Sequence, residues 1–329
     1  MTPLNLFYDE PDPDRWVPFD RFPRRVVRRL FRGPAKIGGQ RLVFLNLCLG
    51  LDRLGVAYRV NDFRHARRHP DETVGIVGKP HLLDVVAWKN PILFGASVFA
   101  HALDDPDLLR RLPVRRVLVP GEWMRRMFEP TYGNRVSAWP TGIDTETWAP
   151  SNSEKDVDFL IYDKVRWRHD EFERTLIAPL RDTLRGRGLR TATLRYGFYE
   201  ERDFHALLAR CRAMIFLCEH ETQGIAYQQA LACGVPILAW DRGGDWQDPA
   251  FYPERVRYGP VSSVPYWDRR CGVRFQDAAE FDARLDEFLD RLTREDFAPR
   301  DYILENLTLE RCARRYVEHY RAVEASARS

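Results

Sequence analysis

Short apolar segments alternate with amphipathic segments along the chain from residue 38 onward. The segment "GGQRLVFLNLCLGLDRLG", residues 38–55, has apolar residues at helical spacing and ends on Gly55, a favourable helix C-terminus. Short buried strands are predicted at "VAYRV", "TVGIVG", "PILFGASVFA" and "RRVLVP". A short helix is then predicted at "GEWMRRMFEPTYG", and "RVSAWPTGID" predicts a strand that runs into a loop.

The polar segment "APSNSEKD", residues 149–156, is the best linker candidate in the chain because Pro, Ser and Asn lie close together. The alternation then restarts, with strands predicted at "VDFLIYD", "TATLRYG", "AMIFLC" and "PILAW". Helices are predicted between them at "HDEFERTLIAPLRDTLRGRG", "EERDFHALLARC" and "GIAYQQALAC". The wholly apolar "AMIFLC" predicts a central strand that is buried on both faces.

Repeated strand–helix alternation predicts parallel sheets with right-handed crossovers. Two such series around one linker predict an α/β protein with two Rossmann-like domains that face a cleft, residues 1–150 and 151–329. The C-terminal segments "FDARLDEFLDRLTRE" and "TLERCARRYVEHYRAV" have apolar faces and predict helices, which we expect to cross back to the N-terminal domain.

Composition excludes several function classes. The 329 residues are 44% hydrophobic and 30% charged with a net charge of +3, so neither disorder nor general polyanion binding is indicated. No apolar run approaches the ~20 residues that span a bilayer, and the N-terminus lacks the order of a signal peptide. The six cysteines form no C-x-x-C pair, which favours buried reduced thiols and a cytoplasmic protein.

The loop "EHETQG", residues 219–224, follows the central strand "AMIFLC" and precedes a helix. Ligands of open parallel sheets bind beyond the carboxyl ends of the strands, and a helix N-terminus there suits phosphate. Gly224 lets the backbone approach an oxygen closely, Thr222 and Gln223 offer short polar contacts, and the Glu221 carboxylate can reach a sugar hydroxyl. The alternative is an ordinary strand–turn–helix in which Glu221 and Gln229 are only solvated.

The segment "ETQGIAYQQALACGVPILA" resembles the signature of the retaining glycosyltransferases of family 4, the group 1 enzymes of GT-B fold. The pattern is matched at Glu221, Gly224, Ala230, Ala232, Gly234 and Pro236. It departs at Gln229, where the family has a second glutamate. Three weaker likenesses occur in the expected order: "KIGGQRLVFLNL" to the N-terminal Gly-Gly loop, "VLVPGEWMRRMF" to a strand–helix, and "VSAWPTGIDTETWAP" to the interdomain stretch.

The resemblance implies a nucleotide-diphosphate sugar bound mainly by the C-terminal domain, an acceptor bound by the N-terminal one, and no metal. In this chain Glu221 would then hold the donor sugar, and Gly224 and Ile225 would offer backbone N–H groups to sugar or phosphate. Gln229 would contact the ribose, where an amide lacks the charge-assisted part of a carboxylate's hydrogen bond, a loss of about 1 kcal/mol.

Further donor contacts are expected from basic residues and from glycines. Lys164 is the first choice for the diphosphate and Arg166 the second, although the family's spacing of an Arg and a Lys is not reproduced and a surface salt bridge is an alternative. Gly38 and Gly39 precede a helix and could turn N–H groups to phosphate, or form a flexible loop. His101 could contact the reacting sugar or be structural.

Two other signals point elsewhere. The sequence "DPD" occurs at 12–14 and 105–107, in Pro-containing polar segments that favour turns over a metal site. The basic stretch "RFPRRVVRRLFRG", residues 21–33, could rest weakly on anionic lipid or contact an acceptor's phosphate, and a solvated face explains it equally simply. No nucleic-acid-binding module is recognised.

The sequence therefore predicts a glycosyltransferase with an unidentified glycan, lipid-linked or small-molecule acceptor. Two alternatives remain open at this point. A nucleotide-sugar epimerase of the same fold would act on the donor alone. A non-catalytic protein that binds sugar nucleotides would explain the loss of the second glutamate at Gln229.

Overall fold

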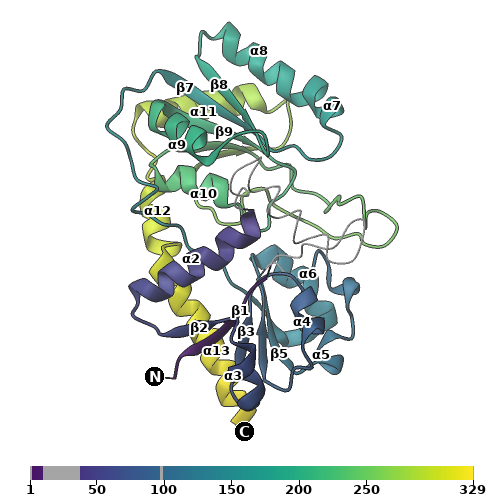
Figure 1. Ribbon diagram of the computed structural model, residues 1–329. Coiled ribbons are helices and arrows are strands. Elements are labelled where there is room, and N and C mark those ends of the chain that lie inside the picture. The colour runs from purple at the N-terminus through teal and green to yellow at the C-terminus, as the bar shows by residue number, and fades with distance from the viewer. Residues whose placement is uncertain (1, 10–37, 97–98, 329) are drawn as a thin grey trace, which may run out of the picture. The chain divides into compact units, whose positions relative to one another are not determined.

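A computed structural model describes residues 2–9, 38–96 and 99–328 of the chain, which form two compact units (Figure 1). The first unit combines Met1–Pro120, Arg125–Gly142 and Cys312–Ser329, and the second combines Gly121–Met124 and Ile143–Arg311. The basic stretch 21–33 and the first "DPD" segment lie outside the described residues.

The first unit is built on a six-stranded parallel sheet in the order β2-β1-β3-β4-β5-β6. Its strands are β1 Leu4–Phe7, β2 Tyr58–Val60, β3 Val74–Ile76, β4 Ile92–Phe94, β5 Val114–Val119 and β6 Val136–Ala138. Its helices are α2 Gly39–Arg53, α3 Phe63–Arg68, α4 His81–Val85, η1 Ala102–Asp104, α5 Leu108–Arg111, α6 Glu122–Tyr132, η2 Gly133–Arg135 and α13 Leu309–Arg328. By the unit boundaries, α6 and α13 each begin in the second unit.

The second unit contains a five-stranded parallel sheet in the order β11-β10-β9-β7-β8. Its strands are β7 Val157–Asp163, β8 Thr191–Arg195, β9 Cys211–Leu217, β10 Ile237–Trp240 and β11 Gly272–Phe275. Its helices are α7 His169–Phe172, η3 Glu173–Ile177, α8 Ala178–Gly186, α9 Glu201–Arg210, α10 Ile225–Ala232, α11 Phe281–Thr293 and α12 Pro299–Asn306. In register, Leu160 of β7 lies between Ala192 of β8 and Met214 of β9.

Helices cover both faces of the second unit's sheet. On one face, side chains of η3, α8 and α11, such as Leu180 and Phe288, pack with Ile161 and Ile215 in a buried cluster. Strand residues next to Ile161 and Ile215 point to the other face, where aromatic rings of α9 and α10 pack on them. For example, the ring of Tyr227 packs on that of Phe216, with centroids 5.5 Å apart. The wholly apolar part of β9, Ala213–Leu217, is therefore the central, doubly covered segment that its sequence predicts.

The prediction of two Rossmann-like α/β domains is confirmed. The predicted C-terminal return is confirmed for the end of the chain, because the α13 residues from Cys312 onward belong to the first unit, whereas α11 and α12 belong to the second. The strand predicted over residues 91–100 is shorter than expected, since it covers only Ile92–Phe94. No helix in the part of the chain that the structure describes is long and apolar enough to cross a membrane.

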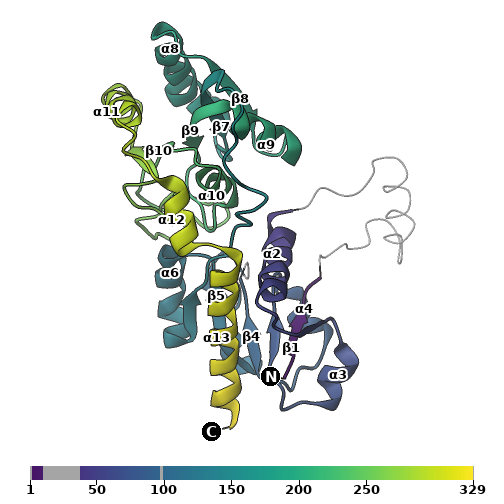
Figure 2. The same ribbon diagram turned by 90° about the vertical axis from the view of Figure 1, so that its left-hand side faces the viewer.

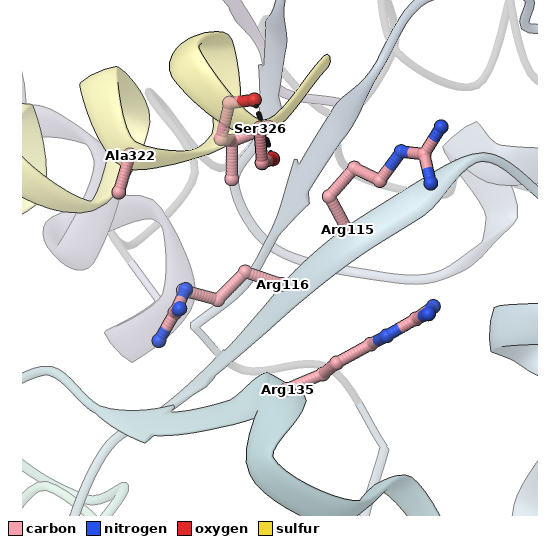
Figure 3. A pocket seen from close by; sticks show the side chains of 6 residues that line it. Arg115, Arg116, Arg135, Ala322 and Ser326 are labelled. Carbon is pink, nitrogen blue, oxygen red and sulfur yellow. Dashed lines mark hydrogen bonds between the residues drawn. The ribbon is translucent and has the colours of Figure 1, made fainter. Parts of the chain in front are cut away.

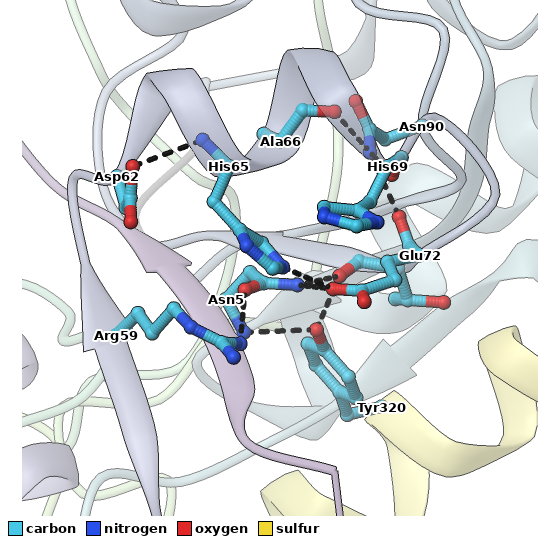
Figure 4. A network of polar contacts seen from close by, with 10 residues as sticks. Asn5, Arg59, Asp62, His65, Ala66, His69, Glu72, Asn90 and Tyr320 are labelled. Atoms are coloured by element: carbon cyan, nitrogen blue, oxygen red, sulfur yellow. Dashed lines mark hydrogen bonds and ion pairs between the residues drawn. The ribbon is translucent and has the colours of Figure 1, made fainter.

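The sheet of the first unit holds α13 through hydrogen bonds to Tyr320 (Figure 4). The Asn5 backbone N–H donates to the Tyr320 hydroxyl at 3.0 Å, and that hydroxyl donates to the Thr73 carbonyl. The Asn5 side chain donates to Glu72 Oε2 at 2.9 Å, and His65 Nε2 lies 2.8 Å from the same oxygen. Burial alone would raise the pKa of Glu72, but the hydrogen bonds from Asn5 and His65 outweigh it and lower the pKa. Residues far apart in sequence are thereby tied into one polar network.

We expect Tyr320→Phe to destabilise the protein by about 1–3 kcal/mol, because the buried Asn5 N–H loses its partner and the Thr73 carbonyl keeps only its hydrogen bond from the Asn5 side chain. The matched control is Tyr316→Phe, one turn earlier in α13, whose buried hydroxyl has no hydrogen-bond partner among the described residues. This control should be neutral or slightly stabilising. Chemical denaturation of both variants measures the difference, and equal stability of the two would contradict the assigned role of Tyr320.

Candidate functional site

The predicted donor residues of the second unit gather beyond the carboxyl ends of β7 and β9. Lys164 directly follows β7, and residues 218–224 connect β9 to the N-terminus of α10. Because these two strands are neighbours in a parallel sheet, both loops emerge at the same edge. Lys164 and Glu221 contact each other directly at this edge.

A buried ion pair joins Lys164 and Glu221 at this edge. The Lys164 ammonium contacts Glu221 Oε1, and the two side chains are only 14% and 9% exposed. The ammonium also lies 4.5 Å from the centre of the Tyr196 ring, in the loop after β8. Burial would lower the pKa of Lys164, but the Glu221 carboxylate outweighs it, and the pKa is raised. The site therefore holds one fixed positive and one fixed negative charge out of water.

The backbone of Glu221 is fixed by contacts from distant parts of the second unit. Its carbonyl accepts a hydrogen bond from Trp123 Nε1 at 2.8 Å, and its N–H donates to the Ser262 carbonyl at 2.9 Å. The Trp123 carbonyl accepts in turn from the Tyr258 hydroxyl at 2.7 Å. With its backbone fixed and its Oε1 in contact with Lys164, the Glu221 carboxylate has a defined direction.

Glu219 is a buried carboxylate that organises the loop after β7, a role that sequence reasoning missed. Its Oε1 accepts the backbone N–H groups of Arg166 and Trp167 at 2.9 and 2.8 Å. Its Oε2 makes no hydrogen bond among the described residues and lies 3.9 Å from the Arg166 guanidinium. An acidic residue directly after a buried strand is the sequence signal that could have identified it.

His220 lies buried among three tryptophans and beside an arginine. Ring centroids of Trp123, Trp167 and Trp246 lie 5.8, 5.1 and 6.4 Å from that of His220. Arg166 donates to the His220 carbonyl at 3.2 Å. Burial, together with the positive charge of Arg166, lowers the pKa of His220 to about 3. His220 is therefore neutral at pH 7, and since the unfolded pKa is higher, acidification below about pH 6.5 favours unfolding.

Gly224 forms the turn into α10 with a left-handed backbone, φ +74°. A Cβ atom at this position would lie 2.0 Å from Cε1 of Tyr227. Tyr227 is fully buried, and its hydroxyl accepts the backbone N–H of Tyr266 at 3.0 Å, so the ring cannot move away easily. Glycine is thus required here by both conformation and space, and the turn leaves the first N–H groups of α10 for capping or ligand contact.

The three glutamines and one threonine of this segment differ in their surroundings. Gln223 and Gln228 bond to each other, with Gln228 Nε2 donating to the Gln223 carbonyl at 2.6 Å and Gln223 Nε2 donating to Gln228 Oε1 at 3.2 Å. Thr222 is half-buried beside them. The Gln229 side chain is buried, and its amide has no hydrogen-bond partner within the described residues.

The other three predicted site residues belong to the first unit. Gly38 is the N-cap of α2 and Gly39 its first residue, and a Cβ at either position would meet nothing within 4 Å. His101 is buried, and its Nδ1 accepts the Leu103 N–H at 3.0 Å at the start of η1. His101 therefore has a capping role, and its contact with a sugar stays a prediction.

All six cysteines are free thiols, and Cys48 is the one that is not buried. Among the residues that the structure describes, no group of three or more His, Cys, Asp or Glu side chains could hold a metal ion.

Comparison with known proteins places the chain by its fold. No family model matches the sequence, and no curated protein matches it. Sucrose-phosphate synthase from Thermosynechococcus elongatus matches over 99% of this chain and 100% of its own, with a TM-score of 0.60 and 12% identity. HepE from Anabaena, solved in complex with UDP, matches over 98% of this chain and 100% of its own, with a TM-score of 0.57 and 10% identity.

A third match, TarM, covers 76% of this chain, which spans only 55% of the TarM chain, with a TM-score of 0.53 and 10% identity. The chain therefore has the two-domain α/β fold of GT-B glycosyltransferases. At identities this low, the likeness establishes the fold alone.

We expect Gly224→Ala to destabilise the second unit by about 2–5 kcal/mol, the sum of a left-handed backbone cost and an overpacking cost. Gly188→Ala is the matched control, because Gly188 has φ +71° and open space around its would-be Cβ. Only the backbone cost of about 1–2 kcal/mol applies there. Thermal and chemical unfolding would compare them, and similar losses would mean that contact with Tyr227 does not matter.

Proposed function

We propose that this protein is a glycosyltransferase that moves a sugar from a nucleotide-diphosphate sugar to an acceptor. The observation that carries the proposal is the buried Lys164–Glu221 pair beyond β7 and β9, beside the N-terminus of α10. A site with one fixed ammonium and one fixed carboxylate suits a ligand that carries phosphate next to sugar hydroxyls. The GT-B fold of the neighbours supports this assignment.

Lys164 and the start of α10 provide the positive side of the proposed site. The ammonium would neutralise the diphosphate leaving group, with backbone N–H groups at Gly224 and Ile225 adding the partial positive charge of the helix N-terminus. Arg166 is more than one-third exposed and stacks over Trp167 at 4.6 Å, so it can add a further contact to the diphosphate. On this account the charge that a metal would supply comes from the protein, which is why we propose a metal-independent reaction.

Glu221 provides the negative side of the proposed site. Its carboxylate would accept hydrogen bonds from hydroxyls of the donor sugar, which requires it to exchange part of its contact with Lys164 for the ligand. The ligand offers a compensating exchange, because its phosphates attract the ammonium while its hydroxyls donate to the carboxylate. Retention of the anomeric configuration is proposed from the family resemblance of the "ETQGIAYQQALACG" segment.

Donor and acceptor are proposed only as chemical classes. HepE was solved in complex with UDP, which supports a nucleoside diphosphate as the common part of the donor. The acceptor, a glycan, a lipid-linked sugar or a small molecule, would bind through the first unit. In that unit Gly38 and Gly39 would offer backbone N–H groups to the donor's phosphate, and His101 would contact the reacting sugar. We also propose that the protein acts in the cytoplasm, with weak peripheral contact to membrane through residues 21–33.

Gln229 gives specific support to one rival, a non-catalytic protein that binds sugar nucleotides. Its buried amide stands where the resembled family has a glutamate. We favour a working enzyme because the substitution leaves Glu221, Lys164 and Gly224 unchanged, and these lie nearest the proposed sugar and phosphates. Gln229 would weaken the contact with the ribose, but the residues near the reacting bond would remain in place.

The proposal is tested by incubating the protein with UDP-, GDP-, ADP- and dTDP-sugars, with and without an acceptor library. A transferase releases the nucleoside diphosphate in an acceptor-dependent manner and forms a glycosylated product. Conversion of a donor sugar without any acceptor would identify the epimerase instead. Binding of a donor with neither hydrolysis nor transfer over long incubation would contradict the enzyme assignment.

We expect Glu221→Ala to remove most activity, lowering kcat/KM by about tenfold to a hundredfold or more, because hydrogen bonds to a charged group are worth about 1.5–3 kcal/mol each. Glu221→Gln removes the charge but keeps the shape of the side chain, and it should lose slightly less activity than Glu221→Ala. Glu254→Ala, at an exposed position of the same unit, is the control and should keep full activity. Full activity of folded Glu221→Ala would contradict the assigned role.

We expect Gln229→Glu to leave activity equal or higher, since a carboxylate would restore a charge-assisted hydrogen bond to a ribose hydroxyl. The effect should be seen in KM for the donor more than in kcat, because the ribose lies away from the reacting bond. Steady-state kinetics at saturating acceptor measure both. Loss of activity in a normally folded Gln229→Glu would mean that the amide itself is required.

A further inference from the structure

A hollow of about 210 Å³ lies in the first unit at the amino ends of β5 and β6 (Figure 3). Its volume is below the ~300–1,000 Å³ of pockets that take drug-sized ligands, so it suits a small group and not a whole nucleotide sugar. Strand β5, the short helix η2 and α13 supply its lining, which consists of Arg115, Arg116, Arg135, Ala322, Val323 and Ser326.

Three of these six lining residues are arginines, and none of the six is acidic. Arg115 and Arg135 are exposed and form no ion pair within the described residues. Figure 3 shows their side chains running in the same direction, while Arg116 points the other way. Arg116 is held by Ser137, whose Oγ accepts from Nη1 at 2.6 Å.

The six residues that line the hollow offer no carboxylate to its arginines, whereas several other arginines are paired with carboxylates. In the second unit, Arg187 contacts both Asp282 and Asp286, and Arg270 contacts Asp268 and Glu305. Like charges that are close together repel one another, and a bound anion relieves that repulsion. The arginines of the hollow therefore gain more from an added anion than paired arginines would.

The positive field extends along α13 to His319. Burial is the largest cause that lowers the pKa of His319, and the charge of Arg116 is the second. Arg315 acts in the same direction. Glu318 acts in the opposite direction without reversing the shift. The basic character thus belongs to a surface of several elements and not to one side chain.

We propose that this hollow binds a phosphate group, with Arg115 and Arg135 as its ligands and Arg116 as a supporting charge. The guanidinium fork presents parallel N–H donors that match two phosphate oxygens, which an ammonium group cannot do. The group could belong to a soluble phosphorylated molecule or to a lipid headgroup, since both offer the same oxygens. The site lies at the amino ends of its strands, away from the carboxyl-end loops, and is independent of the proposed sugar transfer.

The test is a footprint of the full chain with phenylglyoxal, an arginine reagent, read at each residue by peptide mass spectrometry. Inorganic pyrophosphate and vesicles containing phosphatidic acid are the two probes, with phosphatidylcholine vesicles as the neutral comparison. We expect a probe to slow modification of Arg115 and Arg135 several-fold. Arg67 and Arg68, exposed on α3 of the same unit, are the internal controls and should react at an unchanged rate.

Each outcome of the footprint either overturns the proposal or shows whether the phosphate group belongs to a soluble molecule or to a lipid. Protection by pyrophosphate supports a soluble ligand, and protection only by phosphatidic acid supports a headgroup. No protection by either probe, or equal protection of Arg67 and Arg68, would overturn the proposal. The double variant Arg115→Gln/Arg135→Gln should then lose binding of the effective probe by about tenfold or more, whereas Arg67→Gln/Arg68→Gln, with the same change in charge, should not.

Discussion

Lys164 and Glu221 carry opposite charges in a place where each would be costly alone. Removing a charge from water costs several kcal/mol, and a buried pair recovers this only through close contact and further polar partners. Here the sheet brings the two residues together, and Trp123 and Ser262 fix the glutamate backbone. Removing one partner of such a pair costs about 3–5 kcal/mol, because the other charge is left uncompensated. The pair therefore constrains the loops after β7 and β9, and with them the entry to α10.

This constraint explains how the site can be arranged in advance for a ligand that carries both phosphate and hydroxyl groups. Of the neighbouring groups, burial keeps His220 uncharged at pH 7, and the Glu219 carboxylate accepts the backbone N–H groups of Arg166 and Trp167. A ligand with phosphate and hydroxyl groups can pair with Lys164 through its phosphates and with Glu221 through its hydroxyls. Neither buried charge is then left without a partner. That exchange is the physical basis of the proposed donor site.

Most of the fold could be predicted from the sequence because short segments rich in apolar residues alternate with amphipathic ones, as on either side of "AMIFLC". Two short strands were missed. Leu4–Phe7 forms β1 in only four residues with the polar Asn5 inside, and Gly272–Phe275 contains Arg274. The position of Asn5 in the sheet depends on Glu72 and Tyr320, residues far away in sequence, so no local pattern could have shown it.

The site was predictable as far as the residues that follow a strand or open a helix, such as Lys164, Glu221 and Gly224. Trp123 could not be found, since it reaches Glu221 across 98 positions of sequence. The roles given to Gly38, Gly39 and His101 rest on resemblance and stay predictions.

The central claim, that the Lys164–Glu221 pair marks a nucleoside-diphosphate site, is tested most directly by calorimetric titration. UDP, GDP, ADP and dTDP would be titrated into the wild type, Lys164→Met and the charge-conserving Lys164→Arg, each first shown to be folded. The account predicts that at least one nucleotide binds the wild type and that Lys164→Met weakens it about tenfold or more, with Lys164→Arg in between. Equal affinity in wild type and folded Lys164→Met, or no binding of any of the four, would contradict it.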